Sequence, residues 1–553
     1  MIALLFLSLV IPLITALLLM LFSSTLTVGN ARWIALSGSV VALLFSTGLL
    51  LKYRSEAVFS LESRSIPAIT TAESEAAMRP RAEFRHEWTA PGQGLQLEFY
   101  FGVDGISVTM IALTALLTVC SVLISWEAIQ ERPAAFYALL LILETGLIGV
   151  FCAFDLVLFY VFFEMTLIPL FFLIAIWGGS DRRHAAMKFF LYTLTGSLVT
   201  LSGLVFVVLT AAQAGVAHPT SLPSLTAWVA EHPFSAELQT TLFLVVAAGF
   251  LIKVPVFPFH TWLPLAHVEA PTAGSVLLAG VLLKLGTYGF LRICLPLFPS
   301  AAFSLGLPVI GLLSVIGIIY GSLCALAQRD IKKLVAYSSV AHLGFCMLGL
   351  FALNVEGITG SVLQMINHGL STGALFLIVG MIYERYHTRQ MDDLGGLALR
   401  LPLIAVCMVF ISMSSIGLPG LNGFVGEFLS LAGMFKAVPI YAALGTVGVV
   451  LGAWYLLGAV QHVFFGQLRE PHHGDEEISD LKPREFLAIA PLAILCLWIG
   501  LQPSSVIDLI QPDVKVMVQS LERKSASPLS DEQHSANATV GERSSLIFHH
   551  PSN

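Results

Sequence analysis

Long apolar segments recur along most of the chain, and short polar stretches separate them. A helix that crosses a bilayer needs about 20 consecutive apolar residues, and about fourteen segments meet that requirement. The predicted spans are residues 2–22, 33–51, 105–125, 135–153, 155–177, 186–212, 240–255, 272–295, 303–328, 332–353, 358–383, 401–418, 440–466 and 484–502. Two further helical pieces are predicted, a Pro-rich amphipathic segment over 256–270 and a short helix over 421–436. The pattern therefore predicts an all-α polytopic membrane protein.

The composition supports this class, since 56% of the 553 residues are hydrophobic and only 11% are charged. A soluble domain carries roughly 25% charged residues. The first apolar segment has no basic residue before it and no cleavage site of small residues after it. We therefore expect a membrane helix there rather than a removable signal. The chain has no basic run for a nucleic-acid partner, no Walker loop, no dinucleotide fingerprint and no H-E-x-x-H motif.

The cysteines and histidines give no clear metal or redox motif. All seven cysteines lie in apolar segments and none forms a C-x-x-C pair, so we interpret them as packing residues. His472 and His473 precede an acidic run, where weak metal binding is one interpretation and a solvated loop is the simpler one. We expect this chain to bind no metal and no cofactor.

Polar segments divide the chain into parts. An exterior loop is predicted over 53–98, a second polar loop over 213–239, and a polar, partly ordered tail over 504–553. The predicted parts are residues 1–134 with the first three spans, 135–300 and 301–470 as two similar halves, 471–503 with the last span, and the tail.

Basic residues give the orientation. Connections after odd-numbered spans carry most of the loop lysines and arginines: 182, 183 and 188; 329, 332 and 333; 385 and 389; 469, 482 and 484. Short basic loops stay in the cytoplasm. The pattern predicts a multi-pass protein of the inner (plasma) membrane with both termini on the exterior side.

Both halves contain a helix that a Pro/Gly break interrupts beside an ionisable residue. The first break follows Lys253 at Pro255, and the second, Gly-Leu-Pro-Gly at 417–420, precedes Glu427. Interrupted helices at matching places indicate inverted repeats around an ion site near the middle of the membrane. Ordinary proline kinks are the alternative interpretation.

Four charged residues lie inside apolar segments, namely Glu164, Lys253, Lys284 and Glu427. A charge at the bilayer centre costs about 2.5–3.5 kcal/mol or more, and such residues usually mark ion or proton pathways. A structural carboxylate at Glu164 and a lysine that reaches the interface at Lys253 are the alternatives.

Glu164 and Lys253 could form a proton valve. Burial lowers the pKa of a lysine from about 10.4 by several units, and a nearby carboxylate raises it again. A lysine would therefore hold its proton when the pair is close and release the proton when the pair separates. This hypothesis requires the two side chains to face each other.

His342 and His368 lie in adjacent spans with several polar neighbours, among them Ser338, Ser339, Asn367, Ser371 and Thr372. Histidine can take up and pass on a proton near pH 7. We expect these residues to hold a water chain between Lys284 and Glu427. Interhelical hydrogen bonds are the alternative role for both histidines. Glu144, also within an apolar segment, is a further candidate.

Five long segments carry a resemblance to a known family. They are FFEMTLIPLFFLIAIWGG, KVPVFPFHTWLPLAHVEAPTAGSVLLAGVLLKLGTYG, AQRDIKKLVAYSSVAHLGF, LQMINHGLSTGALFLIVGMIYERYHTR and GLPGLNGFVGEF. These segments strongly resemble the antiporter-like subunits of respiratory complex I, NADH:quinone oxidoreductase, and within that family the M type, or chain 4. The resemblance covers roughly residues 100–470.

The resemblance implies fourteen membrane helices, with two inverted five-helix repeats in which helices seven and twelve are broken. It also implies proton translocation, with Glu164 and Lys253 as a modulating pair, Lys284 as the central relay and Glu427 as the terminal group. M-type members have glutamate in helix twelve, where sister subunits and multisubunit sodium/proton antiporters generally have lysine. NADH, flavin, iron–sulfur clusters and quinone would bind to partner subunits.

One residue departs from the family pattern. The family often reads Trp-Leu-Pro-Asp-Ala-His, whereas Leu265 stands in place of the aspartate here. The role of that carboxylate is therefore in doubt in this chain, although Glu269 could substitute for it.

The first functional hypothesis is a proton-pumping membrane subunit of NADH:quinone oxidoreductase, not catalytic alone, whose partners include homologous antiporter-like subunits. The second is a subunit of a multisubunit cation/proton antiporter. The third is a membrane subunit of a hydrogenase-type or formate-linked complex, and a solute permease is more remote.

Overall fold

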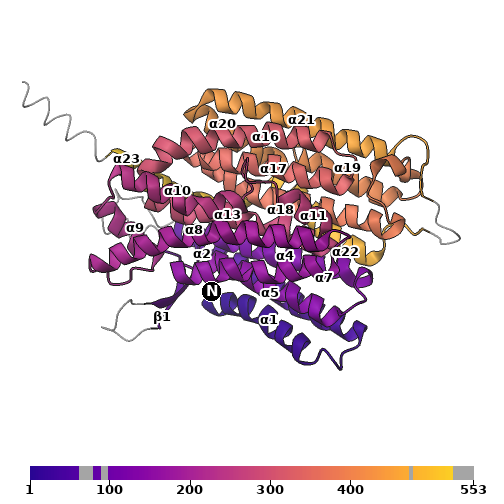
Figure 1. The fold of residues 1–553 in the computed structure, drawn as a ribbon, viewed down its shortest axis with the longest axis horizontal. Helices are drawn as coiled ribbons and strands as arrows, with labels where there is room; N and C mark the ends of the chain where they lie inside the picture. Colours follow the sequence, from indigo (N-terminus) through magenta and orange to yellow (C-terminus); the bar gives the residue numbers. More distant parts are fainter. Residues whose placement is uncertain (62–78, 89–96, 472–477, 527–553) are drawn as a thin grey trace, which may run out of the picture.

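The computed structural model describes residues 1–61, 79–88, 97–471 and 478–526. Thirteen helices in this part are long and apolar enough to cross a membrane, and a shorter apolar helix, α19 (Pro402–Ser415), accompanies them. All fourteen predicted spans are therefore helical. The helices run roughly along the long axis of the molecule (Figure 1). His472 and His473, for which weak metal binding was one interpretation, lie outside the described residues.

The membrane-length helices follow one another in a single bundle. They are α1 (Ile2–Leu21), α2 (Val28–Leu61), α4 (Gly105–Ala128), α5 (Pro133–Cys152), α6 (Leu156–Met165) with α7 (Leu167–Trp177), α8 (Arg182–Gln213), α10 (Ala236–Lys253), α12 (Thr272–Leu277) with η1 (Leu278–Leu282), α13 (Lys284–Gly289), η2 (Phe290–Cys294) and α14 (Leu295–Leu297), α15 (Pro299–Ala301) with η3 (Ala302–Ile310) and α16 (Gly311–Leu326), α17 (Ile331–Leu350), α18 (Val355–Tyr386), α21 (Pro439–Phe464) and α22 (Pro483–Leu501).

Shorter elements connect these helices. They are β1 (Ala82–Glu87), β2 (Glu98–Val103), α9 (Leu222–Glu231), α11 (Leu263–Glu269), α20 (Asn422–Ala437), α23 (Ser504–Ala526) and two short 3₁₀ helices, Met391–Asp393 and Leu397–Leu399. The predicted pieces at 256–270 and 421–436 correspond to α11 and α20.

Three elements lie where polar loops or a tail were predicted. The segment 53–98 contains the end of α2 and strand β1, which pairs antiparallel with β2, from Ala82 opposite Val103 to Glu87 opposite Glu98. Helix α9 lies in the predicted loop 213–239, and α23 occupies the described part of the tail. Short amphipathic elements of this kind have too few apolar residues to stand out from a membrane-span pattern.

Polar side chains define where several helices begin. Asp104, Asp155 and Asp330 accept hydrogen bonds from backbone N–H groups in the first turns of α4, α6 and α17. An N-cap of this type stabilises a helix by about 1 kcal/mol. Asp155 and Asp330 are 2% and 8% exposed, so they are buried caps rather than solvated residues at span ends.

The centre of the bundle consists of two fully buried helices, the segment 272–297 and α18. These helices carry Lys284, Arg292 and His368, and burial within the bundle keeps such side chains away from lipid. By contrast, less than half of the apolar window in α1, α2, α8, α16, α21 and α22 is buried within the chain. The outer helices thus present apolar side chains to lipid or to partner subunits, and the central helices do not.

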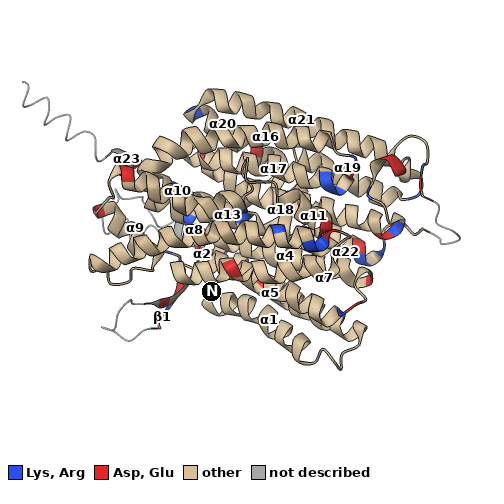
Figure 2. Cartoon of the chain, viewed as in Figure 1, with Lys and Arg blue, Asp and Glu red and all other residues tan. Residues whose placement is uncertain are grey.

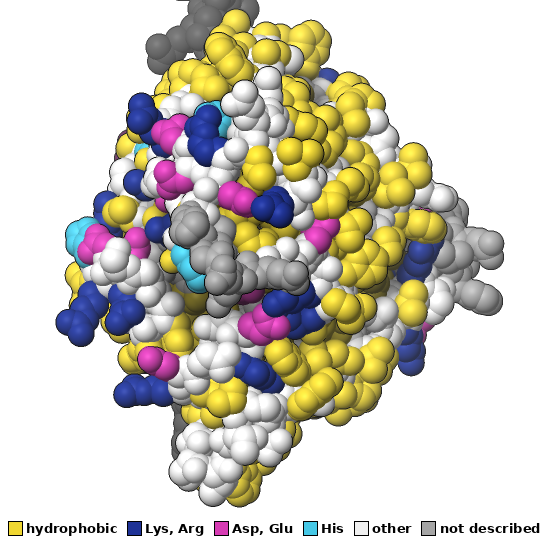
Figure 3. Space-filling model, turned by 90° about the vertical axis from the view of Figure 1, so that its right-hand side faces the viewer, with side chains coloured by type: hydrophobic (Ala, Val, Ile, Leu, Met, Phe, Trp, Pro, Cys, Tyr) yellow, Lys and Arg dark blue, Asp and Glu magenta, His cyan; other side chains and the backbone are white. Residues whose placement is uncertain are grey.

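Charged residues gather at the two ends of the bundle, with a few isolated ones inside it (Figure 2). The basic end carries the loops at 178–182, 327–331 and 387–401 and the segments 465–471 and 478–483, and Figure 3 looks onto it. There, charged side chains lie among the backbone and uncharged polar side chains, while hydrophobic side chains cover the flanks. The hairpin end carries β1, β2, α9 and α23 (Figure 1).

Both predicted helix breaks are present. Helix α10 ends at Lys253, and the chain continues through Pro255 and Pro258 to α11. Helix α19 ends at Ser415 and α20 begins at Asn422. Gly417 and Gly420 in the second break have φ of +78° and +94°, which glycine adopts without steric cost.

Close packing of α8 and α10 depends on two facing glycines. A Cβ atom on Gly249 would lie 2.5 Å from Thr200 Oγ1 and 2.8 Å from the carbonyl oxygen of Gly196. We expect Gly249→Ala to force these helices apart and to destabilise the chain by about 1–3 kcal/mol. The measurement is the midpoint of heat-induced aggregation of the detergent-solubilised protein.

Gly317→Ala in α16 is the matched control, since a Cβ there meets nothing within 4 Å. Both substitutions raise helix propensity equally. An equal change in the midpoint for both variants would contradict the packing argument.

Candidate functional site

Lys284 lies in the central helix between two π-helical segments, η1 and η2. The side chain is fully buried. Its ammonium donates a hydrogen bond to the carbonyl oxygen of Ala279 and lies 2.7 Å from Nδ1 of His368. Turns of π-helix are frequent at functional sites. The irregular helix thus supplies polar contacts for a charge that is out of reach of bulk water.

A continuous series of ionisable side chains leads from Lys284 to Glu427. The ring centroids of His368 and His342 are 5.6 Å apart, and His342 Nδ1 lies 2.9 Å from Glu427 Oε1. The same oxygen accepts a hydrogen bond of 3.1 Å from Gln364 Nε2. Helices α13, α18, α17 and α20 each contribute one of the four residues. The structure therefore brings together Lys284, His368, His342 and Glu427, which we call the central chain.

Polar atoms that are free of hydrogen bonds border the central chain. Within the described residues, the buried atoms without a partner include His368 Nε2, Asn367 Oδ1, Gln364 Oε1 and Thr372 Oγ1. Buried polar groups are nearly always hydrogen-bonded, to protein or to water, so these atoms are suited to bind water. The predicted polar neighbours Ser338, Ser339 and Ser371 already use their hydroxyl protons, because each hydroxyl donates to a carbonyl oxygen of its own helix.

Glu164 and Lys253 are near each other but do not form an ion pair. Lys253 is 1% exposed, and its Nζ lies 4.5 Å from the ring centroid of Phe163. The two charges interact electrostatically, yet within the described residues Lys253 Nζ and Glu164 Oε1 have no hydrogen-bond partner. This arrangement corresponds to the separated state of the predicted valve.

The two lysines stand on helices that are in contact. A Cβ atom on Gly286, next to Lys284, would lie 2.8 Å from the carbonyl oxygen of Phe250 and 2.5 Å from Val254 Cγ2. No hydrogen bond joins Lys253 to Lys284 in the part of the chain that the structure describes. Any proton transfer between them requires water or a movement of side chains.

Glu144 is not part of the central chain. It lies fully buried in α5, and neither carboxylate oxygen has a hydrogen-bond partner among the described residues. No described ion pair connects it to the lysines or histidines. The sequence singled it out for its apolar surroundings alone, which say nothing about its partners.

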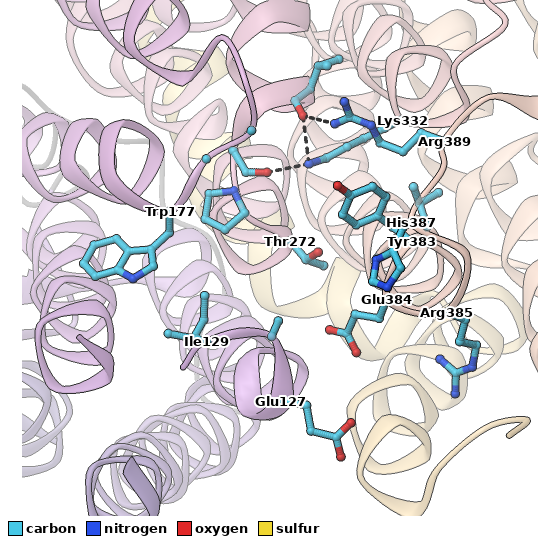
Figure 4. A pocket seen from close by; sticks show the side chains of 18 of the residues that line it. Glu127, Ile129, Trp177, Thr272, Lys332, Tyr383, Glu384, Arg385, His387 and Arg389 are labelled. Carbon is cyan, nitrogen blue, oxygen red and sulfur yellow. Dashed lines mark hydrogen bonds between the residues drawn. The ribbon is translucent and has the colours of Figure 1, made fainter. Parts of the chain in front are cut away.

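A cavity of about 700 Å³ opens at the basic end of the bundle (Figure 4). Lys332, Glu384 and Arg389 line it, and Lys332 Nζ donates to the carbonyl oxygens of Ala270 and Val268, at 2.6 and 3.3 Å. Glu384 Oε1 is buried and has no partner among the described residues. The sequence assigned Lys332 to a loop and passed over Glu384, because residues at span ends look solvated.

His267 interacts electrostatically with one residue of this cavity and with one residue of the central chain. It is fully buried, stacks on Phe376 with centroids 4.6 Å apart, and interacts with the charges of both Lys332 and Lys284. Neither ring nitrogen has a hydrogen-bond partner among the described residues. His267 is therefore placed to connect the cavity to Lys284.

Glu269 also lines the cavity, where its Oε2 accepts a hydrogen bond of 2.9 Å from the backbone N–H of Asp181. Leu265, at the position where the family often has aspartate, is half-buried in the same short helix, α11. Glu269 thus supplies a carboxylate two residues after His267, although its contact anchors the loop after α7.

Comparisons with known proteins agree on the relatives of this chain. The family model described as NADH:quinone oxidoreductase/Mrp antiporter, TM, matches residues 153–452. NADH-quinone oxidoreductase subunit M of Rhodobacter capsulatus is 43% identical over 497 residues, which cover 89% of this chain and 91% of the relative. NADH-ubiquinone oxidoreductase chain 4 of Marchantia polymorpha is 43% identical over 76% of this chain and 83% of its own length.

Solved structures show the same fold. A chain of respiratory complex I from Thermus thermophilus with bound NADH matches with a TM-score of 0.78 and 30% identity, over 94% of this chain and 99% of that one. A chain of the Mrp complex from Dietzia sp. matches with a TM-score of 0.71 at 21% identity, over 94% of this chain and 100% of that one. The chain therefore belongs to the family of membrane subunits shared by NADH:quinone oxidoreductase and Mrp antiporters.

Proposed function

We propose that this chain is the M-type, proton-translocating membrane subunit of an NADH:quinone oxidoreductase. The observation that carries the proposal is the central chain, in which two histidines join a buried lysine to a buried carboxylate. The relatives at 38–43% identity named as subunit M support the M-type assignment. Ionisable residues inside a membrane bundle are costly and serve charge movement by default.

The proposed proton route begins at the basic end. A proton enters the cavity beside Glu384 and Lys332 and reaches Lys284 by way of His267. It then passes through His368 and His342 to Glu427, along the contacts of 2.7 and 2.9 Å at the two ends of the central chain. Movement of Glu164 toward Lys253 changes the charge near Lys284 and so controls when that lysine releases its proton.

Partner subunits carry the redox chemistry in this proposal. Electrons pass from NADH through flavin and iron–sulfur clusters to quinone outside this chain, which binds no cofactor and is not catalytic alone. Its partners include homologous antiporter-like subunits, and the structural relatives are chains of multisubunit complexes. The basic end faces the cytoplasm across an inner (plasma) membrane, with both termini outside.

A subunit of a cation/proton antiporter is the second candidate, because the Mrp complex shares the fold. The carboxylate at Glu427 favours the first function, since lysine is usual at that place in the antiporters. Deletion of the chain discriminates between the two. Under the first function, membranes lose proton pumping driven by NADH and keep sodium/proton exchange. Loss of exchange with intact NADH-driven pumping would establish the antiporter function instead.

Glu427→Gln is expected to lower NADH-driven proton uptake in assembled membranes at least tenfold. A neutral amide can keep the contact with Gln364 but cannot take a proton from His342. Proton uptake is measured by quenching of a pH-sensitive dye, with assembly followed on native gels.

Glu356→Gln is the matched control, since Glu356 is exposed and its partner Lys436 lies on the surface. Normal proton uptake in an assembled Glu427→Gln complex would remove Glu427 from the route.

A further inference from the structure

A second series of buried polar side chains lies beyond Lys284 toward the hairpin end. Tyr288 and Arg292 follow Lys284 at four-residue intervals on the central helix, and all three are buried. At 1.5 Å per residue, Arg292 lies about 12 Å beyond Lys284 along the helix axis. The positions four residues apart share one face of the helix, so the three side chains form a line.

Hydroxyl groups connect this line. Tyr288 donates to the carbonyl oxygen of Phe151 at 3.0 Å, and its hydroxyl lies 3.0 Å from Ser107 Oγ. Arg292 Nη2 donates to the same serine oxygen at 3.5 Å. Hydroxyl groups both donate and accept, so Tyr288 and Ser107 could relay a proton from the surroundings of Lys284.

Arg292 closes the line with a buried ion pair. Its guanidinium pairs with Asp104, and the two side chains are only 6% and 7% exposed. The guanidinium also lies 5.2 and 5.5 Å from the ring centroids of Tyr288 and Phe154. Arginine does not release its proton in proteins, so this position holds a permanent positive charge.

Helix α23 covers the ion pair from the hairpin end. Asp513 Oδ2 accepts a hydrogen bond of 2.7 Å from the N–H of Gly105, the residue after Asp104. A Cβ atom on Gly105 would lie 1.8 Å from the carbonyl oxygen of Leu509, so α23 and the start of α4 are in direct backbone contact. The ion pair is thus separated from solvent by a packed amphipathic helix.

We propose that Arg292, fixed by Asp104, is a barrier that prevents protons on Lys284 from leaving directly at the hairpin end. This proposal rests on the proposed function and deepens it, because a barrier here directs protons to His368 and Glu427. A fixed arginine excludes protons from an otherwise polar path in other membrane proteins. Asp104 balances the charge of the guanidinium, so the barrier rests on a group that donates hydrogen bonds and cannot accept a proton from Tyr288 or Ser107.

The test uses the whole complex in proteoliposomes and measures passive proton leak under an imposed potassium diffusion potential, without NADH. The double variant Arg292→Gln/Asp104→Asn removes both charges and keeps hydrogen-bonding groups of similar shape. Because it removes the fixed guanidinium from the path without changing the net charge, it is expected to leak protons several-fold faster than the wild type while NADH:quinone reductase turnover persists. Arg292→Lys, which retains the positive charge, is expected to be as tight as the wild type.

A third substitution separates a barrier from loosened packing. Adding Lys284→Met to the double variant is expected to abolish the extra leak, because the proposed path begins at Lys284. A leak that persists without Lys284, or no leak in an assembled double variant, would overturn the proposal. If the double variant does not assemble, Ser107→Ala, which removes the hydroxyl between Tyr288 and Arg292 and keeps the ion pair, is expected to leave the leak at the wild-type level, and a faster leak in that assembled variant would overturn the proposal.

Measurements on the wild-type complex distinguish a failure of this proposal from a failure of the proposed function. A wild-type complex that builds no NADH-driven gradient argues against the proposed function. A wild-type complex that pumps, beside an assembled double variant that does not leak, overturns the barrier alone.

Discussion

Replacing Lys284 with methionine is expected to abolish NADH-driven proton pumping and to lower NADH:quinone reductase turnover on the order of 10²-fold in an assembled complex. Lys284 is contributed to the central chain by the buried segment 272–297, and its ammonium contacts His368 at 2.7 Å. Methionine has a similar length and fits an apolar helix, so the change removes the proton carrier rather than the packing. In a coupled pump, electron transfer slows when the proton cannot move.

The measurement is turnover of NADH oxidation by inverted membrane vesicles together with dye quenching, and native gels report assembly. Lys436→Met is the control, because Lys436 is 60% exposed and pairs with Glu356 on the surface. An assembled Lys284→Met complex that pumps normally would exclude the central chain as the proton route. A complex that turns over normally but does not pump would show that the route is present without obligatory coupling.

Glu164→Gln is expected to leave the complex assembled and to suppress both reductase activity and pumping about tenfold or more. Glutamine keeps the shape of Glu164 but cannot supply the charge that acts on Lys253, and among the described residues no other charge acts on that ammonium. Under the valve hypothesis, Lys253 would then lack the charge that holds its proton. The residue is half-buried, and one carboxylate oxygen has no hydrogen-bond partner in the described part of the chain, so an amide causes little loss of packing.

The experiment compares reductase rates and dye quenching in the same vesicles, with Glu237→Gln as a control on the exposed first turn of α10. Normal activity and pumping in the Glu164 variant would rule out the valve. Loss of pumping with normal reductase activity would assign Glu164 to the proton route itself and not to its control.

The two sets of variants also test how the parts of the site depend on one another. Residues that act in series give effects that are far from additive, because the route fails once at whichever step is blocked. Lys284→Met combined with Glu427→Gln is therefore expected to be no worse than Lys284→Met alone. If the fold losses of the two single variants multiply in the double variant, Lys284 and Glu427 act on two independent routes.

Apolar segment lengths and the two Pro/Gly breaks were enough to predict the membrane class and the helical spans, and the buried charges gave the candidate residues. A span must match the thickness of the bilayer, and a charge inside it is costly, so both can be recognised in the sequence alone. The breaks at Pro255 and Gly417 are visible because proline and glycine have local backbone requirements. The hairpin of β1 and β2 and helix α23 escaped prediction, since amphipathic elements outside the apolar spans take their stability from the surface on which they pack.

Which charged residues meet was decided only by the tertiary structure. Lys284, His368, His342 and Glu427 come from four helices, and no spacing along the chain links Glu427 to His342 at 2.9 Å. Glu144 and Glu164 look alike in sequence, yet only Glu164 lies near enough to a lysine to interact with its charge. Asp104 and Arg292, 188 residues apart, form their buried pair because α4 packs beside the central helix. A cost of burial can be predicted from each residue's own surroundings, whereas a partner depends on how helices far apart in the chain fit together.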